Sequence, residues 1–308
     1  MVTTLNKIVY KAFGLIMMSD IRLPELPEII DKQQDVIDIV IELADLTELW
    51  KEFAEPNRHF VVKENIVLFQ ISNTAIYLIE EGKRIVVSPL HDADEDHVRL
   101  YVLGTCMGAL LQQRKVLPLH GSAIAIDGKA YAIVGDSGAG KSTLASAFLN
   151  EGYQLISDDV IPVSLSNDNI PIVTPAYPQQ KLWQESLDAF GMESDKYRSI
   201  FDREMKFAVP VTSKFVSTAL PLAGVFELIK TDRNEVLIEP IVNLERLHTL
   251  FYHTYRNFFI ARLGLMDWHF KITASIANKI KVYRVQRPIN RFTANDLTSM
   301  IINTIEKE

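Results

Sequence analysis

Eight consecutive residues, 135–142, combine small, hydroxyl and cationic side chains in a spacing suited to phosphate binding. They run Gly-Asp-Ser-Gly-Ala-Gly-Lys-Ser and fit the pattern G-x-x-x-x-G-K-[ST] in full. The glycines let the backbone turn so that successive N–H groups point at phosphate oxygens. Lys141 would reach the β- and γ-phosphates, and the Ser142 hydroxyl would complete a magnesium shell. The segment therefore predicts a P-loop that binds a nucleoside phosphate together with magnesium.

The context of this loop agrees with the motif. An apolar strand, 131–134, precedes it, and an apolar helix continues from 144, so the positive end of a helix dipole would face the phosphates. We expect ATP and Mg²⁺ as cofactors. The expected nucleotide contacts are Gly135, Asp136, Ser137, Gly138, Ala139, Gly140, Lys141, Ser142 and Thr143.

A pair of acids, Asp158 and Asp159, follows the apolar segment 154–157, which we expect to be a strand that ends at the pair. P-loop proteins place a magnesium-directed Asp at such a strand end. Ser142 and Asp158 are the candidate metal ligands, and the second acid would take the proton of an attacking hydroxyl. The sequence does not decide which acid is base and which is metal ligand. A solvated turn is the alternative interpretation of the pair.

His120 stands at the start of a strand that leads round to the loop. Near an Asp and a triphosphate, an imidazole could tune the carboxylate or touch phosphate. A packed or surface histidine is the alternative.

The elements that would position these residues follow from apolar patterning. Segments 117–126 and 129–134 flank Asp127-Gly128, the strongest short-range signal of a β-hairpin. Helices are expected near 97–114, 141–150, 181–190, 243–253, 255–263, 268–279 and 293–306, and further strands near 222–230, 235–239 and 281–286. Residues 1–92 are rich in short strand patterns, so we expect a smaller β-rich N-terminal domain, which recognises substrate or braces its neighbour, and a catalytic domain of 93–308. The fold class is α/β, mixed α+β.

Composition excludes several classes of protein. The formal net charge of −7 gives no cationic face for nucleic acid, so no nucleic-acid partner is expected. A single cysteine, Cys106, rules out a disulfide framework and is expected to be a buried thiol in a helix. No secretory signal is visible and the most apolar helical segment, 100–111, is too short to cross a bilayer. We therefore expect a cytoplasmic protein without a membrane partner.

Residues 117–163 resemble the catalytic domain of the HPr kinase/phosphorylase family. The similarity is carried by Leu119-His120-Gly-Ser, by the P-loop with its preceding hairpin, and by Gly152-Tyr-Gln-Leu-Ile-Ser-Asp158-Asp159. The resemblance implies a P-loop catalytic domain of that fold and a kinase that phosphorylates a serine of a protein. It also implies an active site of His120, Lys141, Asp158, Asp159 and the loop, and a homo-oligomer.

The chain departs from that family's pattern in two places. Thr143 follows Ser142 where those enzymes typically carry Glu, and their Gly-rich second signature has no counterpart in 175–183. With Tyr10-Lys-Ala-Phe-Gly and Leu23-Pro-Glu-Leu, the sequence is most similar to the branch that phosphorylates the C-terminal serine of lasso-peptide precursors. Cations would then have to offset phosphoryl charge. The candidates, each alternatively a solvated surface charge, are Lys181, Arg198, Arg203 and Lys206, of which Arg203 and Lys206 are preferred and Arg203 is assigned to catalysis.

The sequence thus predicts a phosphotransferase that uses ATP and Mg²⁺ and acts on the serine of a precursor peptide or small protein. Two alternatives stay open, a small-molecule kinase and a nucleotide-gated module that hydrolyses ATP slowly. The 17 positions between Lys141 and Asp158 favour a kinase, because switch ATPases usually place longer sensing segments there.

Overall fold

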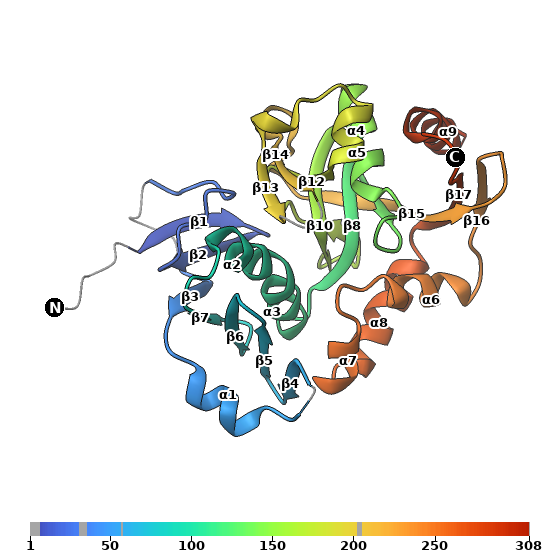
Figure 1. Cartoon of the computed structure of the whole chain (residues 1–308). Helices are drawn as coiled ribbons and strands as arrows, with labels where there is room; N and C mark the ends of the chain where they lie inside the picture. Colours follow the sequence, from blue (N-terminus) through green and yellow to red (C-terminus); the bar gives the residue numbers. More distant parts are fainter. Residues whose placement is uncertain (1–6, 31–35, 57, 202–204, 308) are drawn as a thin grey trace. The chain divides into compact units, whose positions relative to one another are not determined.

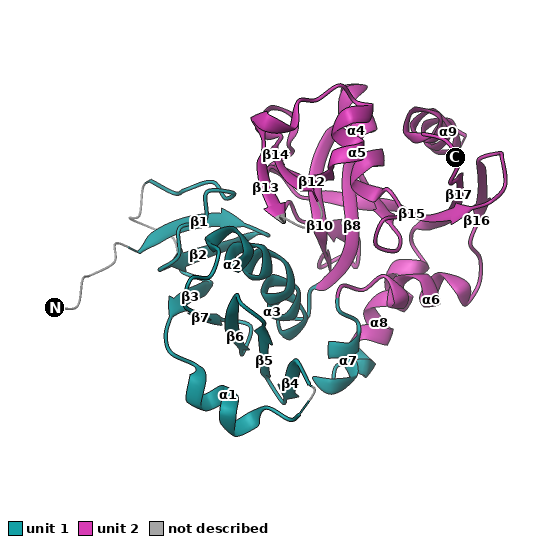
Figure 2. Cartoon of the chain, in the orientation of Figure 1, with its two compact units in different colours: residues 1–116, 256–268 teal, residues 117–255, 269–308 magenta. Residues whose placement is uncertain are grey.

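The chain divides into two compact units in a computed structural model that describes residues 7–30, 36–56, 58–201 and 205–307. One unit comprises 1–116 and 256–268, and the other comprises 117–255 and 269–308 (Figure 2). The sequence places a boundary at 92/93 instead. Residues 93–116 group with the first unit because the helix over 95–113 packs on its strand β6 (Ala75–Glu80).

The first unit is built on a seven-stranded mixed sheet (Figure 1). Its strands, in spatial order, are β1 (Ile8–Ala12), β2 (Leu15–Ser19), β3 (Ile39–Leu43), β7 (Arg84–Pro89), β6, β5 (Ile66–Ile71) and β4 (Phe60–Lys63). Helices α1 (Thr47–Phe53) and α7 (Phe258–Arg262) also belong to this unit. The β-rich character expected of the N-terminal region is therefore present.

One long helical segment of the first unit is α2 (Glu95–Tyr101), a π-helical turn (Val102–Cys106) and α3 (Met107–Gln113). It begins at Asp94, whose carboxylate accepts hydrogen bonds from the N–H groups of Asp96 and His97 at 2.7 and 3.0 Å. Cys106 is fully buried in the π turn, and burial raises the pKa of its thiol well above the usual value. The expected buried thiol is confirmed.

The second unit holds a seven-stranded sheet that carries the P-loop segment. Its strands, in spatial order, are β11 (Pro171–Val173), β10 (Gln154–Leu165), β8 (Leu117–Ile126), β9 (Lys129–Val134), β15 (Leu220–Thr231), β17 (Lys281–Pro288) and β16 (Leu237–Pro240). Strands β8 and β9 form the expected hairpin with Ile126 paired to Lys129. Strands β9, β15 and β17 run parallel, so their carboxyl ends meet at one edge.

Helix α4 (Lys141–Asn150) follows β9 and packs through Leu144, Phe148 and Leu149 into the core of this unit. Helix α9 (Ala294–Glu306) contributes Leu297 and Ile301 to the same core. Helices α6 (Glu245–Tyr252) and α8 (Met266–Ala277) agree with the expected segments. No helix in the described part of the chain is long and apolar enough to cross a membrane.

A small three-stranded sheet stands beside the main one, in the order β12 (Gln179–Trp183), β14 (Lys206–Pro210), β13 (Arg198–Phe201). The helix expected from 181 was wrong at its start, because residues 179–183 pair with β14 and the helix α5 (Gln184–Ala189) begins only afterwards. This correction places Lys181 on a strand. The molecule is thus of mixed α/β class, as the sequence predicted.

Candidate active site

The loop 135–140 connects the last residue of β9 to the first residue of α4. A Cβ atom at Gly135 would lie 2.5 Å from the carbonyl oxygen of Leu228 on neighbouring β15, so only glycine fits there. Gly140 has a φ of 101°, in the region that favours glycine, and directly precedes Lys141. The loop therefore wraps tightly over the edge of the sheet and opens at the amino end of α4, the arrangement that P-loop proteins use to hold phosphate.

Lys141 lies across this loop. Its Nζ donates hydrogen bonds to the carbonyl oxygens of Gly135 at 2.9 Å and Asp136 at 3.0 Å, and the residue is 8% exposed. Burial lowers the pKa of its ammonium group, whereas the charges of Asp159 and Asp158 raise it. The lysine is thus held at the mouth of the loop by two carbonyls that phosphate oxygens can replace.

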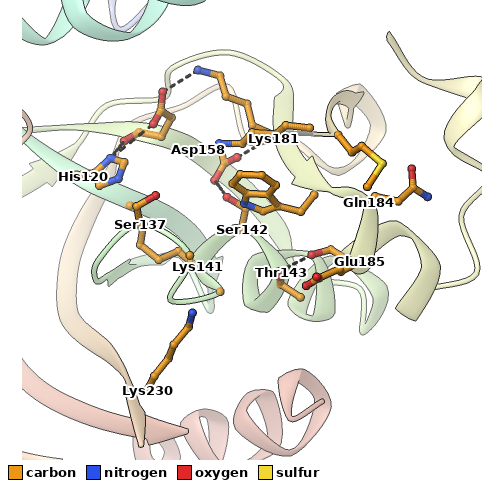
Figure 3. A pocket seen from close by; sticks show the side chains of 18 of the residues that line it. His120, Ser137, Lys141, Ser142, Thr143, Asp158, Lys181, Gln184, Glu185 and Lys230 are labelled. Carbon is orange, nitrogen blue, oxygen red and sulfur yellow. Dashed lines mark hydrogen bonds and ion pairs between the residues drawn. The ribbon is translucent and has the colours of Figure 1, made fainter. Parts of the chain in front are cut away.

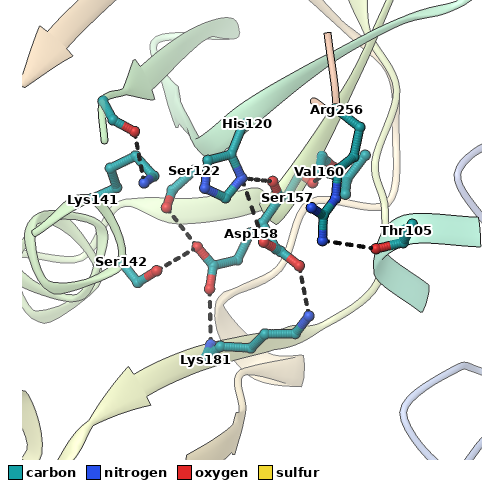
Figure 4. Close-up of polar contacts among 12 residues, drawn as sticks. Thr105, His120, Ser122, Lys141, Ser142, Ser157, Asp158, Val160, Lys181 and Arg256 are labelled. Atoms are coloured by element: carbon teal, nitrogen blue, oxygen red, sulfur yellow. Dashed lines mark hydrogen bonds and ion pairs between the residues drawn. The ribbon is translucent and has the colours of Figure 1, made fainter. Parts of the chain in front are cut away.

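Asp158 is the centre of a buried hydrogen-bond cluster. Its Oδ1 accepts from Ser122 Oγ at 2.5 Å and Ser142 Oγ at 3.0 Å, and its Oδ2 accepts from the N–H of Lys181 at 2.8 Å (Figure 4). Burial raises the pKa of this carboxyl, and the hydrogen bonds from Ser122 and Lys181 counteract part of that rise. The cluster fixes the Asp158 carboxylate against the first turn of α4.

The oxygen atoms Ser142 Oγ and Asp158 Oδ1 are suitable ligands for magnesium. Magnesium is a hard cation that usually binds through few protein oxygens together with substrate phosphates and water. Among the residues that the structure describes, no group of three or more His, Cys, Asp and Glu side chains is placed to hold a metal by itself. In P-loop proteins the bound nucleotide supplies further magnesium ligands.

Asp159 faces a different set of partners. Its Oδ2 lies 2.7 Å from Lys181 Nζ, and its Oδ1 lies 3.6 Å from His120 Nδ1. Burial by itself raises the pKa of this carboxyl, but the charges of Lys181, of His120 once it is protonated in acid, and of Lys206 outweigh burial and leave the pKa below its usual range. In the same pair, burial lowers the pKa of Lys181, but Asp159, Tyr177 and Tyr255 together outweigh burial, so its pKa lies above the usual value. Asp159 is therefore an ionised acceptor.

The two acids lie inside strand β10 and not at its end, which corrects the expectation from sequence. Asp158 pairs with Ser122 and Asp159 with Gly121, and the strand continues to Leu165. Neighbouring residues of a regular strand point to opposite faces. Asp159 has a φ of 75°, which breaks that alternation, and both carboxylates line the same cavity.

His120 lies on β8 across from the acids. Its Nδ1 is 3.1 Å from the carbonyl oxygen of Asp159, so both neighbours of this nitrogen are acceptors and it carries the hydrogen. Burial lowers the pKa of the imidazole to about 4, with Asp159 opposing and Lys141 adding to the shift. At neutral pH the ring is uncharged, so it can orient Asp159 but supplies no positive charge to phosphate.

These groups surround a cavity of about 470 Å³ (Figure 3). Of the residues expected from sequence, it is lined by His120, Ser137, Gly138, Gly140, Lys141, Ser142, Thr143, Asp158 and Asp159. Three others of the loop contribute differently. Gly135 and Asp136 hold Lys141 through their carbonyls, and Ala139 is buried. Thr143 Oγ1 lies 2.7 Å from Ser186 Oγ of α5.

The structure places the basic residues proposed from sequence in different positions. Lys181 and Lys206 line the cavity, and Lys206 Nζ lies 5.3 Å from the centre of the Trp183 ring. Arg198 lies on β13 and is not among the described residues that line the cavity. Arg203 lies outside the described residues, so its assignment to catalysis stays a prediction.

Several residues of the site were not predicted, and three of them contact the groups described above or the P-loop: Ser122, Lys230 and Arg287. Ser122 stands two positions after His120, on the same face of β8, and this spacing was an available signal. Lys230 and Arg287 are paired with each other on β15 and β17 and line the cavity from the edge where the P-loop begins. The sequence indicates these two strands but not that β15 pairs with β9 and that β17 follows β15 in the same sheet.

Comparison with known proteins supports part of this picture. No protein-family model matches the chain. A segment of 64 residues is 41% identical to the HPr kinase/phosphorylase of Mycoplasmopsis pulmonis (strain UAB CTIP), and the match covers 20% of this chain and 21% of that protein. The chain is therefore homologous to HPr kinase/phosphorylase over a segment, about a fifth of that relative's length.

Among solved structures, the HPr(Ser) kinase/phosphatase of Coxiella burnetii aligns with 62% of this chain and 94% of its own. The sequence identity is 17% and the TM-score is 0.32.

Proposed function

We propose that the chain is a kinase that uses ATP and Mg²⁺ to phosphorylate a serine hydroxyl of a peptide or small protein. One observation carries the proposal: an ionised Asp159, paired with Lys181 at 2.7 Å, lines the same cavity as Lys141 and Ser142. A module that only binds nucleotide does not need a second buried carboxylate next to its magnesium-directed Asp. The 64-residue match to an HPr kinase/phosphorylase supports the same class of reaction.

In this proposal Asp159 orients the acceptor hydroxyl. A carboxylate with a lowered pKa is a weak base, so it does not ionise the serine in advance. It receives the proton while the serine oxygen bonds to the γ-phosphorus and the bond from that phosphorus to the β–γ bridging oxygen breaks. ADP and phosphoserine are the products, and the proton then leaves Asp159 to solvent.

The other residues hold the reactants. Lys141 would exchange its two carbonyl partners for phosphate oxygens, and Asp158 and Ser142 would hold Mg²⁺. Bound Mg²⁺ would neutralise charge on the β- and γ-phosphates. Lys206 lies at the wall of the cavity and is a candidate to offset charge on the transferred group. His120 keeps Asp159 in place through its Nδ1.

The narrower proposal concerns the acceptor, which we infer to be the C-terminal serine of a lasso-peptide precursor. Its support is the sequence resemblance near the N-terminus, at Tyr10–Gly14 and Leu23–Leu26. A homo-oligomeric state is proposed as well and rests on the resemblance of residues 117–163 to HPr kinases, and a cytoplasmic location is proposed with it.

The test is transfer of label from [γ-³²P]ATP with Mg²⁺ to a panel of peptides that end in Ser, matched to peptides that end in Ala. We expect label on the Ser peptides only, and none with Lys141→Ala or Asp159→Asn. Label on a metabolite would establish the small-molecule kinase instead. Steady hydrolysis of ATP without any labelled acceptor would exclude the kinase function and support the ATPase module.

A further inference from the structure

A second cavity of about 350 Å³ adjoins the first in the same unit. The two share a wall made by Gly138, Gly140 and Thr143 of the P-loop segment, by Glu185 and Ser186 of α5, and by Lys230 and Arg287. Asp158 and Asp159 line the first cavity only. A ligand whose terminal phosphate faces these acids can therefore extend past the shared wall into the second cavity.

The second cavity also has an apolar part. It is formed by Ile289 and Phe292, in the connection between β17 and α9, and by Leu297 on α9, and the polar Arg291 and Thr293 lie beside it. Ile289 is 56% exposed and Phe292 is 48% exposed, although both have large apolar side chains. The Phe292 ring is held in a T-shaped contact with Phe190, with 5.5 Å between ring centres. An aromatic ring that is fixed but half open offers a surface for a planar group.

Arg287 is fixed at the junction of the cavities. Its Nε donates to the carbonyl oxygen of Ala139 at 2.6 Å, and it lies 3.3 Å from the position a Cβ atom of Gly140 would take. Lys230, paired with it across β15 and β17, places its Nζ 3.6 Å from the corresponding position at Gly138. Arg287 and Lys230 thus place two cationic groups at the boundary between the cavities, where the phosphates of such a ligand would end and the rest of it would begin.

We propose that the nucleoside of ATP occupies the second cavity, with its base against Phe292 and Ile289 and its α-phosphate beside Arg287 and Lys230. This assignment rests on the proposed function, since it takes the γ-phosphate to lie near Asp159. It makes Phe292 the residue that distinguishes a nucleotide from a bare chain of phosphates. Stacking of a base on an aromatic side chain is sequence-tolerant and strong enough to change affinity about tenfold.

The experiment is isothermal titration of the full chain with two probes, Mg-ATP and Mg-tripolyphosphate, which share the phosphates but not the nucleoside. We expect Phe292→Ala to weaken ATP binding about tenfold and to leave tripolyphosphate binding within about twofold. Phe292→Tyr keeps the ring and should bind ATP normally. Phe270→Ala, an exposed aromatic on α8 that lines neither cavity, is the matched control and should change neither affinity.

Circular dichroism checks that each variant is folded. If Phe292→Ala were unfolded, Ile289→Ala serves in its place, with an expected threefold loss confined to ATP. Equal weakening of both probes, or no weakening of either, would overturn the nucleoside site. Tight binding of tripolyphosphate with no advantage for ATP in the unmodified chain would also overturn it while leaving the P-loop intact. Failure of the unmodified chain to bind either probe would overturn the proposed function as well.

Discussion

At the scale of single residues, the ion pair of Lys181 with Asp159 is the feature with the largest expected effect on chemistry. Lys181 is 5% exposed, so its removal would leave the carboxylate without its nearest counter-charge in a poorly solvated place. The pKa of Asp159 would then rise, because burial raises it and Lys181 is the first charge opposing that rise. The pair thus keeps Asp159 ready to accept a proton at all ordinary pH values.

We expect Lys181→Met to lower the rate of phosphoryl transfer at least 100-fold and to move the acid limb of the pH–rate profile to higher pH. The reason is that the buried carboxylate, no longer paired, would be protonated within the working range. Lys181→Arg keeps the charge and should recover part of the rate. The measurement is initial rate against pH from 4 to 9.

The control is Lys196→Met, which removes a lysine that is 65% exposed and pairs with Glu193 on the surface. It should leave both the rate and the profile unchanged. An unshifted acid limb in Lys181→Met would contradict the assigned role of the ion pair, whatever the loss in rate.

A second prediction at the scale of single residues concerns Ser122. It donates to the same Asp158 oxygen as Ser142 and is fully buried, so it orients the carboxylate expected to hold Mg²⁺. Removing such a supporting hydrogen bond typically costs about tenfold or more in metal affinity. Ser122→Ala should raise the Mg²⁺ concentration needed for half-maximal transfer about tenfold, whereas Ser299→Ala on the exposed face of α9 should not. An unchanged magnesium dependence in Ser122→Ala would rule out this role.

At the scale of elements, the sequence predicted best where the signals are local. The hairpin of β8 and β9, the loop and α4 are determined by a turn pair, three glycines and an apolar helix face, all within 117–150. The extent of β10 was missed because it depends on pairing with β8, which continues beyond the acids. The start of α5 was missed because residues 179–183 are held as a strand by β14, more than twenty positions away.

For the site, too, the sequence predicted the residues with local signals and missed those that depend on distant strand pairing. The sequence named His120, Lys141, Ser142, Asp158 and Asp159, and the structure brings all five to one cavity. The partner of Asp159 could not be singled out among four basic residues, because Lys181 reaches it only through the pairing of β12 in the small sheet. Lys230 and Arg287 depend likewise on the parallel order of β9, β15 and β17.

At the scale of elements, a substitution at Gly121 tests the close packing of β8 against β9. It lies opposite Asp159, and a Cβ atom there would meet the carbonyl oxygen of Ile133 on β9 at 2.1 Å. Gly121→Ala must therefore push β8 away from β9, and we expect a loss of about 2–3 kcal/mol in the free energy of unfolding. Transfer should fall with it, since His120 and Ser122 flank this position. Thermal and urea unfolding measure the first effect.

The matched change is Gly128→Ala in the turn of the same hairpin. Its φ is 72° but nothing lies within 4 Å of the added atom, so only the backbone strain of about 1 kcal/mol applies. If Gly121→Ala were no more destabilising than Gly128→Ala, the close approach of the two strands would not matter to stability.

At the scale of the whole molecule, two histidines of the second unit make its stability depend on pH. His269 is 2% exposed, its Nε2 lies 2.9 Å from Thr254 Oγ1, and burial lowers its pKa to about 4. His120 has its pKa lowered to about 4 as well, with burial as the main cause. In the unfolded chain both imidazoles would titrate near 6.5.

The sign follows from where protons bind. Between pH 6.5 and about 4 the unfolded chain holds more protons on these histidines than the folded chain, so stability falls as pH falls through this window and the effect is complete below about pH 4. For His269 the difference in pKa between the unfolded chain, 6.5, and the folded chain, about 4, corresponds to a loss of about 3 kcal/mol in the free energy of unfolding. Asp158, whose pKa is raised in the folded state, acts in the opposite direction.

Replacing His269 separates its effect from those of the other groups. We expect the melting temperature of the unmodified chain, followed by near-ultraviolet circular dichroism, to fall steadily from pH 6.5 to 4. His269→Gln keeps a side chain that can hydrogen-bond to Thr254 but cannot become charged in this range, so its decline should be shallower even if it is less stable at pH 7. Parallel curves for the two proteins would show that His269 takes up its proton without unfolding, and the buried, neutral state assigned to it would be wrong.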